Sequence, residues 1–168
     1  HTSVGARGIA SGVVSAIDIA LWDITGKAAN KPVYQLLGGK MRDDIDLYAN
    51  GWFDGCETPD EYAQAARDVV LAAGHTALKL SPLRQDEANL RTGGISPEAA
   101  DAASDIVAAI RETVGPNHEI LIDAHGNFNV PTAVRLGNRL YEESNIGWFE
   151  EPVPAESNAA LKLIRPQM

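Results

Sequence analysis

Four side chains that could do chemistry lie in or directly after short apolar stretches of this 168-residue sequence. Asp123 ends the stretch EILID, His125 comes two residues later, Glu150 ends IGWFE, and Lys79 lies within ALKL. Carboxylates are hard oxygen donors, and a pair of them, completed by waters and substrate oxygens, is the usual way to hold Mg²⁺. A histidine or a lysine beside such a pair could transfer a proton or stabilise an anion. The pattern therefore predicts a magnesium site with acid–base groups around it.

Each of these residues also has a purely structural interpretation. A strand-terminal acid can cap the next helix or pair with a lysine, a loop histidine can bond to solvent, and a lysine ammonium can reach solvent along its stem. The functional interpretation of His125 is strengthened by its position two residues after Asp123, because residues two apart on an extended chain point to the same side. Asn50, Trp52 and Ser81 follow predicted strands and are candidate substrate contacts. An aromatic residue such as Trp52 is nevertheless found more often in a core.

Strands alternate with helices along the second part of the sequence. The apolar patterns predict strands centred near residues 47, 78, 121 and 148, with helices over 58–73, 96–114, 131–143 and 157–164. Such alternation favours a parallel sheet built from βαβ units, in a (β/α) barrel or a doubly wound sheet. The candidate residues then lie at the carboxyl ends of strands, where barrels place their active sites. No G-x-G-x-x-G segment follows a strand, so a dinucleotide-binding fold has no support.

Two helices are predicted before the first strand. Over 13–29, apolar residues recur every three or four positions and predict one buried helix face, with Trp22 also in the core (Val14, Ile17, Leu21, Ile24, Ala28). Pro32 suits the first turn of a short second helix, which ends at Gly38. The polar stretch 83–95 predicts a loop of unusual length, and such loops are often functional.

Composition narrows the classes of partner. The formal net charge is −9, which disfavours nucleic acid and anionic membranes as partners, because phosphate binding needs lysine and arginine. No uninterrupted run of about 18 apolar residues occurs, and the first residues lack the pattern of a signal peptide. Cys56 is the single cysteine, so no internal disulfide forms, which suits the cytoplasm. An anionic substrate remains compatible with this charge if a cation sits in the site.

Several segments together resemble one family. SAIDIALWDITGKAANKPVYQLLGG is similar to the segment that leads into the barrel in the mandelate racemase/muconate lactonizing enzyme branch of the enolase superfamily. ALKLS resembles its second-strand lysine motif, DAHGNF its first metal-ligand motif, and WFEEPVP its second. The resemblance covers about residues 5–157. It implies an α/β fold in which residues 1–40 form the helical end of an N-terminal capping domain, and 41–168 form about four βα units of a modified TIM barrel.

The resemblance also implies roles for individual residues. The family binds Mg²⁺ through three carboxylates and removes the proton α to a substrate carboxylate, with the metal stabilising the enediolate. Asp123 and Glu150 resemble the first two metal ligands, and Lys79 resembles the first lysine of the family's K-x-K motif. Ser81 replaces the second lysine, which racemases, epimerases and cycloisomerases generally use as a base. His125 matches the D-x-H variant of galactonate- and mannonate-type dehydratases, where the histidine protonates the departing β-hydroxyl.

Three hypotheses follow. The first is a Mg²⁺-dependent dehydratase acting on a small sugar-acid carboxylate, and the second is a racemase, epimerase or cycloisomerase of the same superfamily. By the family's spacing, the third metal ligand and the general base are expected after Met168, so the chain resembles an internal fragment. The third hypothesis is therefore a truncated, non-catalytic half-barrel that associates with itself through unpaired strand edges. Because the family is often oligomeric, a homo-oligomer is expected.

Overall fold

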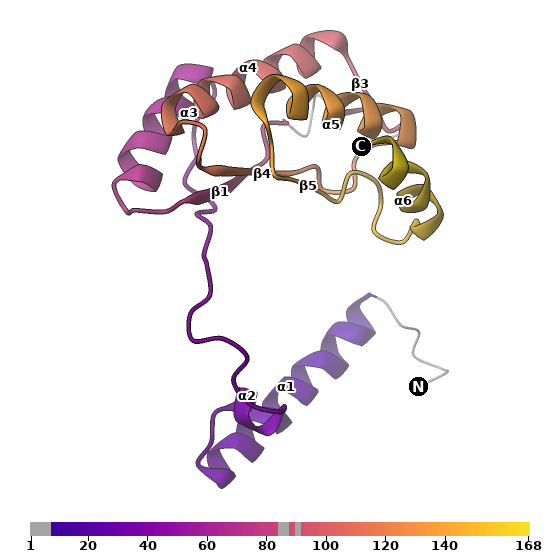
Figure 1. Cartoon of the computed structure of the whole chain (residues 1–168). Helices are drawn as coiled ribbons and strands as arrows, with labels where there is room; N and C mark the ends of the chain where they lie inside the picture. Colours follow the sequence, from indigo (N-terminus) through magenta and orange to yellow (C-terminus); the bar gives the residue numbers. More distant parts are fainter. Residues whose placement is uncertain (1–7, 84–87, 90–91) are drawn as a thin grey trace. The chain divides into compact units, whose positions relative to one another are not determined.

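The computed structural model describes residues 8–83, 88–89 and 92–168. The chain divides into two compact units, His1–Asp46 and Leu47–Met168, and each unit is described by itself. Figure 1 shows that the regular elements of the first unit are helices within its described residues, whereas the second unit contains a sheet with helices on one side of it. The candidate site residues all belong to the second unit.

The first unit consists of a long helix and a short one. Helix α1 spans Ile9–Ala29 and helix α2 spans Val33–Leu36, so both predicted helices are confirmed. Helix α1 ends at Asn30, whose φ of 50° is left-handed, a conformation that asparagine tolerates at a helix end. At Gly26 a Cβ atom would lie 2.8 Å from the Lys31 carbonyl oxygen, so the tight turn between the helices requires glycine there.

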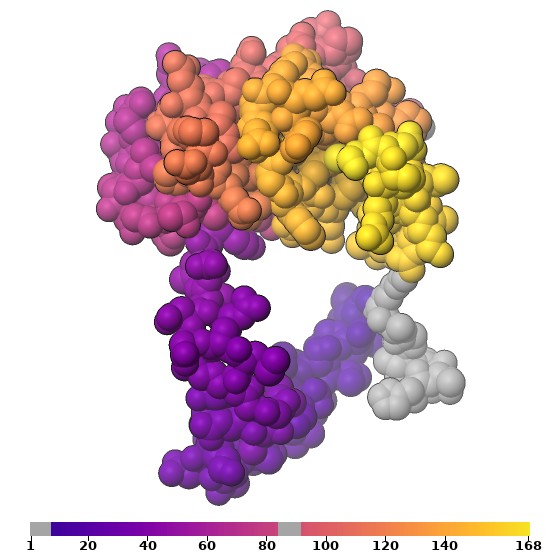
Figure 2. Space-filling model, viewed as in Figure 1, coloured from indigo at the N-terminus to yellow at the C-terminus, as the bar shows by residue number. Residues whose placement is uncertain are grey.

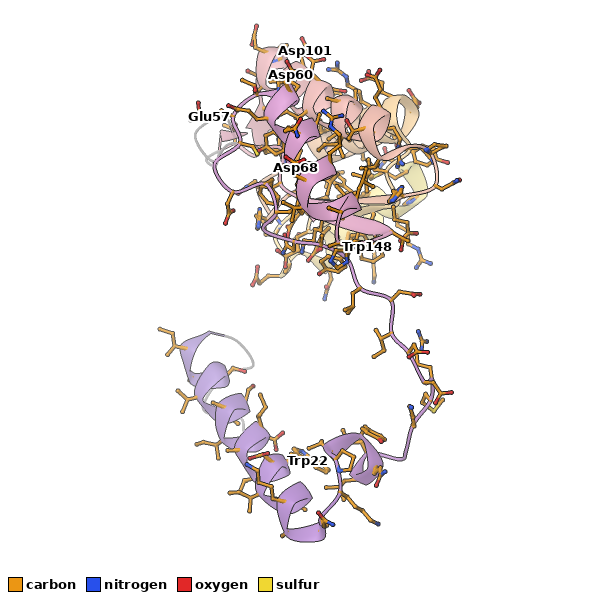
Figure 3. The ribbon with its side chains drawn as sticks, turned by 90° about the vertical axis from the view of Figure 1, so that its left-hand side faces the viewer. Trp22, Glu57, Asp60, Asp68, Asp101 and Trp148 are labelled. Carbon is orange, nitrogen blue, oxygen red and sulfur yellow. The ribbon has the colours of Figure 1, made fainter. Side chains whose placement is uncertain are left out.

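Within its own unit, α1 does not show the predicted buried face. Ile17 is 58% exposed, and its apolar neighbours, including Trp22, are also exposed (Val14, Leu21, Ile24). Figure 3 labels Trp22 on this helix. The physical reason is that apolar side chains such as Ile19 extend around the helix, while α2 is its one helical partner among the described residues of this unit.

Helix α1 is also the one described helix that is long and apolar enough to cross a membrane. Its length and composition alone support this, and a core helix of a soluble protein meets the same criteria. The absence of a membrane span therefore stays a prediction from the sequence. The mean hydropathy is high although Asp18, Asp23 and Lys27 lie within the helix.

A three-stranded parallel sheet forms the centre of the second unit. Its order is β1-β4-β5, so the strands of this sheet are neighbours in the order in which they occur along the chain, and a helical crossover joins each to the next. Helices α3, α4 and α5 pack on one another and cover one face (Figure 1). The strands span Ala77–Leu80 (β1), Glu119–Asp123 (β4) and Trp148–Glu150 (β5), and the helices span Pro59–Ala65 (α3), Pro97–Val114 (α4) and Val130–Ser144 (α5).

Alternation along the strands separates the core from the site. Leu78, Leu80, Ile120 and Ile122 are at most 1% exposed, and they belong to the core cluster that also contains the inner residues of α4 and α5. Because successive side chains of a strand point to opposite faces, the residues between them lie on the face without helices. Helices α4 and α5 pack against each other, and Figure 2 shows this part of the second unit as closely packed, while Figure 3 labels Trp148 of β5 and Asp101 of α4.

Local sequence signals explain where the helices begin. Thr58 caps α3 and forms the predicted capping box, since its Oγ1 accepts the Glu61 amide at 3.3 Å and the Glu61 carboxylate accepts the Thr58 amide at 2.9 Å. Ser96 and Asn129 cap α4 and α5 in the same way through their side-chain oxygens. A proline at the first or second helical position follows each of these caps.

Three parts of the second unit differ from the predicted elements. The expected strand over 44–50 is reduced to a single bridge between Ala49 and Leu78, because the aspartates that precede it have low strand propensity. The helix predicted over 58–73 changes to a π-helix at Ala66–Leu71, and π-turns leave no clear mark in hydrophobic periodicity. The expected loop 83–95 contains a short antiparallel pair, β2 (Ala88–Asn89) and β3 (Gly94–Ile95), although part of it lies outside the described residues.

The chain continues after β5 with two short helical segments. Helix α6 spans Asn158–Ile164, close to its predicted position, and a 3₁₀ turn spans Arg165–Gln167. Helix α6 packs against α5. The α/β class and the parallel sheet are therefore shown, whereas three strands with a bridge make an open sheet.

Arg111 should be the main polar support at the end of the sheet opposite the candidate site. Its guanidinium donates hydrogen bonds of 2.7–3.0 Å to four backbone carbonyls, which come from the end of α4, the end of α5 and the turn before β4 (Gly115, His118, Ser144, Asn145). We expect Arg111→Met to lower the free energy of unfolding by on the order of 3 kcal/mol, because these carbonyls lose a charged donor. Urea unfolding followed by circular dichroism measures it.

Arg139→Met is the matched control, because the partners of this arginine on α5 within the described residues are the exposed carboxylates of Asp101 and Glu143. Exposed ion pairs contribute little to stability, so the control should be much less destabilised. Equal losses in the two variants would contradict the assigned role of Arg111.

Candidate active site

The strand register brings the two candidate acids together. Asp123 and Glu150 are the last residues of β4 and β5 and lie directly opposite each other in the parallel ladder. Lys79 of β1 lies opposite Leu121, two residues before Asp123. Because residues two apart on a strand share a face, all three charged side chains project from the face that carries no helices. The sequence predicted this convergence at the carboxyl ends of strands, and the structure shows it.

A lysine ammonium bridges the two carboxylates. The Nζ atom of Lys79 lies 2.9 Å from Oδ2 of Asp123 and 2.7 Å from Oε2 of Glu150. The side chains of Lys79 and Asp123 are 11% and 12% exposed, and that of Glu150 is 35% exposed. Contacts at these distances from a shielded ammonium are charge-assisted hydrogen bonds, stronger than those between neutral groups.

This arrangement favours the charged forms of the buried pair. Hydrogen bonds to Glu150 and Asp123 raise the pKa of Lys79 well above its usual value, against the opposing effect of burial. Burial acts to raise the pKa of Asp123, but hydrogen bonds from Lys79 and from the His125 amide, together with nearby positive charge, lower it overall. In this state Lys79 is therefore a cation and a hydrogen-bond donor rather than a base.

Tyr48 contributes a contact that the sequence reasoning missed. The Lys79 ammonium lies 5.9 Å from the centre of the Tyr48 ring, within the range of a cation–π interaction. Tyr48 stands one residue before the bridge at Ala49, in the segment where a strand was expected. An aromatic residue at the end of the weak alternation in DIDLY was the available signal.

His125 lies beside Asp123 and is accessible. Its Nε2 atom is 3.5 Å from Oδ2 of Asp123, and its backbone amide donates to Oδ1 of the same carboxylate at 3.0 Å. The side chain is 58% exposed, so a molecule bound at the sheet edge could reach it. The φ of His125 is 51°, in the left-handed region that non-glycine residues seldom adopt. Such backbone strain is common at functional sites.

The segments that leave β4 and β5 run side by side. The amides of Ala124, Gly126 and Phe128 donate to the carbonyls of residues 150, 151 and 152 at 3.0, 2.7 and 3.3 Å. Glu151, directly after the second acid, also has a positive φ, 41°. Both exits thus turn through a left-handed residue within two positions of their carboxylate, which the sequence pattern did not reveal.

The three predicted substrate contacts occupy different environments. Asn50 is exposed, and its Oδ1 accepts the Gly51 amide at 2.9 Å. Ser81 follows β1 directly and is half-buried. Trp52 is 7% exposed and belongs to the core cluster, with its indole N–H donating to the Lys79 carbonyl at 3.0 Å. The substrate-binding role of these residues stays a prediction, and for Trp52 the geometry agrees with the packing alternative.

A tight contact fixes the end of the loop before α4 against the start of α5. The Asn129 amide donates to the Gly93 carbonyl at 2.9 Å, and its side-chain nitrogen donates to the Thr92 carbonyl at 2.7 Å. A Cβ atom on Gly93, where φ is 66°, would lie 2.4 Å from the Asn129 nitrogen. Only glycine therefore permits this approach. Asn129 also caps α5, so it joins the loop to the segment that follows β4.

The donor set fits a divalent cation in part. The ammonium shows that one oxygen of Asp123 and one of Glu150 can reach a single positive centre. Two carboxylates, with waters and substrate oxygens, are suited to Mg²⁺. Among the residues that the structure describes, no group of three or more histidine, cysteine, aspartate or glutamate residues is placed to hold a metal. The described residues thus bring two carboxylates together at this edge of the sheet.

Comparison with protein-family models shows to which family the chain belongs. Residues 61–168 match the family described as enolase C-terminal domain-like, and residues 5–38 match the mandelate racemase/muconate lactonizing enzyme N-terminal domain. The chain belongs to the enolase superfamily. The predicted family membership is therefore confirmed, and α1 and α2 fall within the segment matched by the N-terminal domain.

Similar proteins carry dehydratase and cycloisomerase names. The chain is 41% identical to a D-gluconate dehydratase from Thermoproteus tenax over 85% of this chain and 27% of that protein. It is 34% identical to a D-galactarolactone cycloisomerase from Agrobacterium fabrum over 96% of this chain and 39% of that protein. A solved enolase-superfamily member from Salmonella Typhimurium is 36% identical, with a TM-score of 0.84 over 96% of this chain and 44% of that one. The chain thus spans less than half the length of each.

Removing the bridging ammonium should alter how stability depends on pH. In the wild type the pKa of Asp123 is lowered, so its stabilising contribution is present above the unfolded-state pKa and is lost as the pH falls through the folded-state value. In Lys79→Met the two carboxylates face each other without a cation, so lowering the pH relieves their repulsion. The difference in unfolding free energy between the two proteins should be largest near pH 7 and shrink toward pH 4 in metal-free urea titrations.

Lys162→Met provides the control, because Lys162 is exposed on α6 and forms no ion pair within the described part of the chain. Its difference from the wild type should stay small at every pH. A Lys79→Met difference that is constant with pH would argue against the bridging ion pair.

Proposed function

We propose that the protein containing this chain is a Mg²⁺-dependent dehydratase of small sugar acids. The observation that carries the proposal is the Asp123–Lys79–Glu150 arrangement at the carboxyl edge of the sheet, with His125 adjoining it. The dehydratase relative, 41% identical over most of this chain, supports the reaction class. Because the chain spans only part of that relative, the proposal concerns the full-length protein.

Two residues would hold the metal, and one would complement it. Asp123 and Glu150 would bind Mg²⁺ through the carboxylate oxygens that now contact Lys79. When bound, the metal would polarise the substrate carboxylate and make its α-proton easier to remove. Lys79 stays protonated and supplies a second positive charge for the negative charge that develops on the substrate oxygens. Its role is that of an electrostatic and hydrogen-bonding group.

His125 is proposed as the general acid. The α-proton leaves to a general base, and the electron pair shifts to expel the β-hydroxyl. His125 donates a proton to that hydroxyl, so the C–O bond breaks with loss of water rather than hydroxide. The resulting enol then tautomerises to a 2-keto-3-deoxy acid. The exposed imidazole beside Asp123 supports this assignment, because it could contact substrate while staying oriented by its own backbone.

A second candidate is an isomerase of the same superfamily. The cycloisomerase relative, 34% identical over nearly the whole chain, favours it. Ser81 weighs against it, because a serine cannot act as a base at neutral pH without activation. A racemase or epimerase would exchange the α-proton without losing water.

A third candidate is a non-catalytic half-barrel. In the sheet order β1-β4-β5 the strand β5 pairs with β4 on one side, and an outer strand of this kind can pair with a strand of another copy. A self-associated chain without Mg²⁺ affinity or turnover would support it, and size-exclusion mass with Mg²⁺ calorimetry distinguishes the cases.

His125→Asn should abolish dehydration in the full-length protein while leaving Mg²⁺ affinity within about twofold, because the metal ligands are retained. Formation of the 2-keto-3-deoxy acid from aldonic acids such as gluconate measures the first property, and isothermal calorimetry measures the second. His75→Asn is the matched control, because His75 lies in the turn before β1, at the opposite end of the sheet. Full turnover in His125→Asn would exclude the general-acid role.

Asp123→Asn should weaken Mg²⁺ binding by at least about tenfold, because an amide oxygen lacks the charge that a hard cation requires. Calorimetry on the purified full-length protein measures the affinity. Asp105→Asn is the control, since Asp105 is an exposed acid on α4. Unchanged affinity in Asp123→Asn would show that the metal binds elsewhere.

A further inference from the structure

The backbone of Lys79 faces the weak edge of the sheet. Its amide donates to the Ala49 carbonyl at 2.8 Å, and the Ala49 amide donates to the Ala77 carbonyl at 2.9 Å. In a β-strand the N–H and C=O of one residue point toward the same neighbouring strand. The peptide groups of Lys79 itself therefore point toward Ala49, and β4 does not hold them. The one bridge at Ala49 leaves the Lys79 carbonyl in need of a donor.

A regular parallel ladder would supply that donor from Gly51. Continuing the Ala49 bridge by two residues places the Gly51 amide opposite the Lys79 carbonyl. The chain instead turns at this point, with a φ of 71° at Gly51, and the Gly51 amide donates to Oδ1 of Asn50 at 2.9 Å. The backbone hydrogen bonds of the ladder thus end before the Lys79 carbonyl, which receives none from Gly51.

The indole of Trp52 supplies the hydrogen bond that the Gly51 amide does not make. Its Nε1–H donates to the Lys79 carbonyl at 3.0 Å, and indole nitrogen is a donor only. The ring is 7% exposed and is fixed by edge-to-face contacts with Phe53 and Tyr62, at centroid distances of 5.5 and 6.3 Å. A buried ring held on two sides directs its one polar atom in a fixed direction.

We infer that Trp52 is a positioning residue that acts through Lys79, rather than a residue that touches substrate. It completes the sheet edge with a side-chain hydrogen bond and so fixes the peptide from which the bridging ammonium extends. This rests on the proposed function in so far as Lys79 serves the reaction. A shift of about an ångström in a charged group at an active site can lower turnover substantially, so the effect should reach the rate.

Trp52→Phe tests the inference, because it keeps an aromatic ring and removes the N–H donor. Phe53→Leu is the matched control: it loosens the same aromatic cluster without altering any hydrogen bond to Lys79. Both variants are made in the full-length protein. Two readouts need no activity: hydrogen exchange of the Lys79 amide, and the ¹⁵N NMR signal of its ammonium in metal-free buffer.

In Trp52→Phe we expect amide exchange at Lys79 to rise about tenfold, since the carbonyl of the same residue loses its donor. The ammonium signal, protected in the wild type by Asp123 and Glu150, should broaden or disappear. At saturating substrate, turnover per folded molecule should fall about tenfold. Phe53→Leu should lower the melting temperature without these changes.

The inference is overturned if Trp52→Phe leaves the Lys79 signals unchanged, or if Phe53→Leu changes them equally. It is also overturned if the signals change while turnover does not. A wild-type protein that dehydrates no sugar acid contradicts the proposed function, and the two NMR readouts then decide the positioning role without reference to any reaction.

Discussion

The contact between one ammonium and two carboxylates is the interaction on which the edge of the sheet depends. Asp123 and Glu150 end neighbouring strands in direct register, and like charges opposite each other destabilise a sheet. Lys79, which lies on β1, offsets this repulsion with its ammonium. The two carboxylates need a positive charge beside them, and a divalent cation would also supply one. The residues that stabilise this edge of the fold are therefore also those that suit the proposed chemistry.

The charged cluster and the apolar core can share the same strands because alternate residues of a strand point to opposite faces of the sheet. Leu78, Leu80, Ile120 and Ile122 lie under the helices and form the core, while the residues between them carry the charges. A shift of one residue in the pairing would bury charge and expose leucine and isoleucine. Core burial therefore fixes the register, and the register fixes where the acids meet.

Much of this could be predicted from the sequence, because it depends on short-range patterns. The apolar stretches that end in acids, the cap at Thr58 and the family motifs indicated the parallel sheet, the helices and the convergence of Lys79 with both acids. The exposure of α1 could not be predicted, since periodicity shows that a face is apolar but not what packs against it. The link between Trp52 and Lys79 has no local signature, because it joins residues that are 27 positions apart, and the π-turn leaves no clear mark in hydrophobic periodicity.

The parallel exits after β4 and β5 have a consequence for comparing or exchanging segments between relatives. Three backbone hydrogen bonds join 124–128 to 150–152, and left-handed residues lie in both segments, His125 and Gly126 in the first and Glu151 in the second. Neither exit can change its path without breaking bonds to the other. A chimaera that takes only one of these two segments from a relative would disturb the hydrogen bonds between them. A chimaera that takes both segments from the same relative would keep these bonds. The two motifs, more than twenty residues apart in sequence, thus form a single structural module.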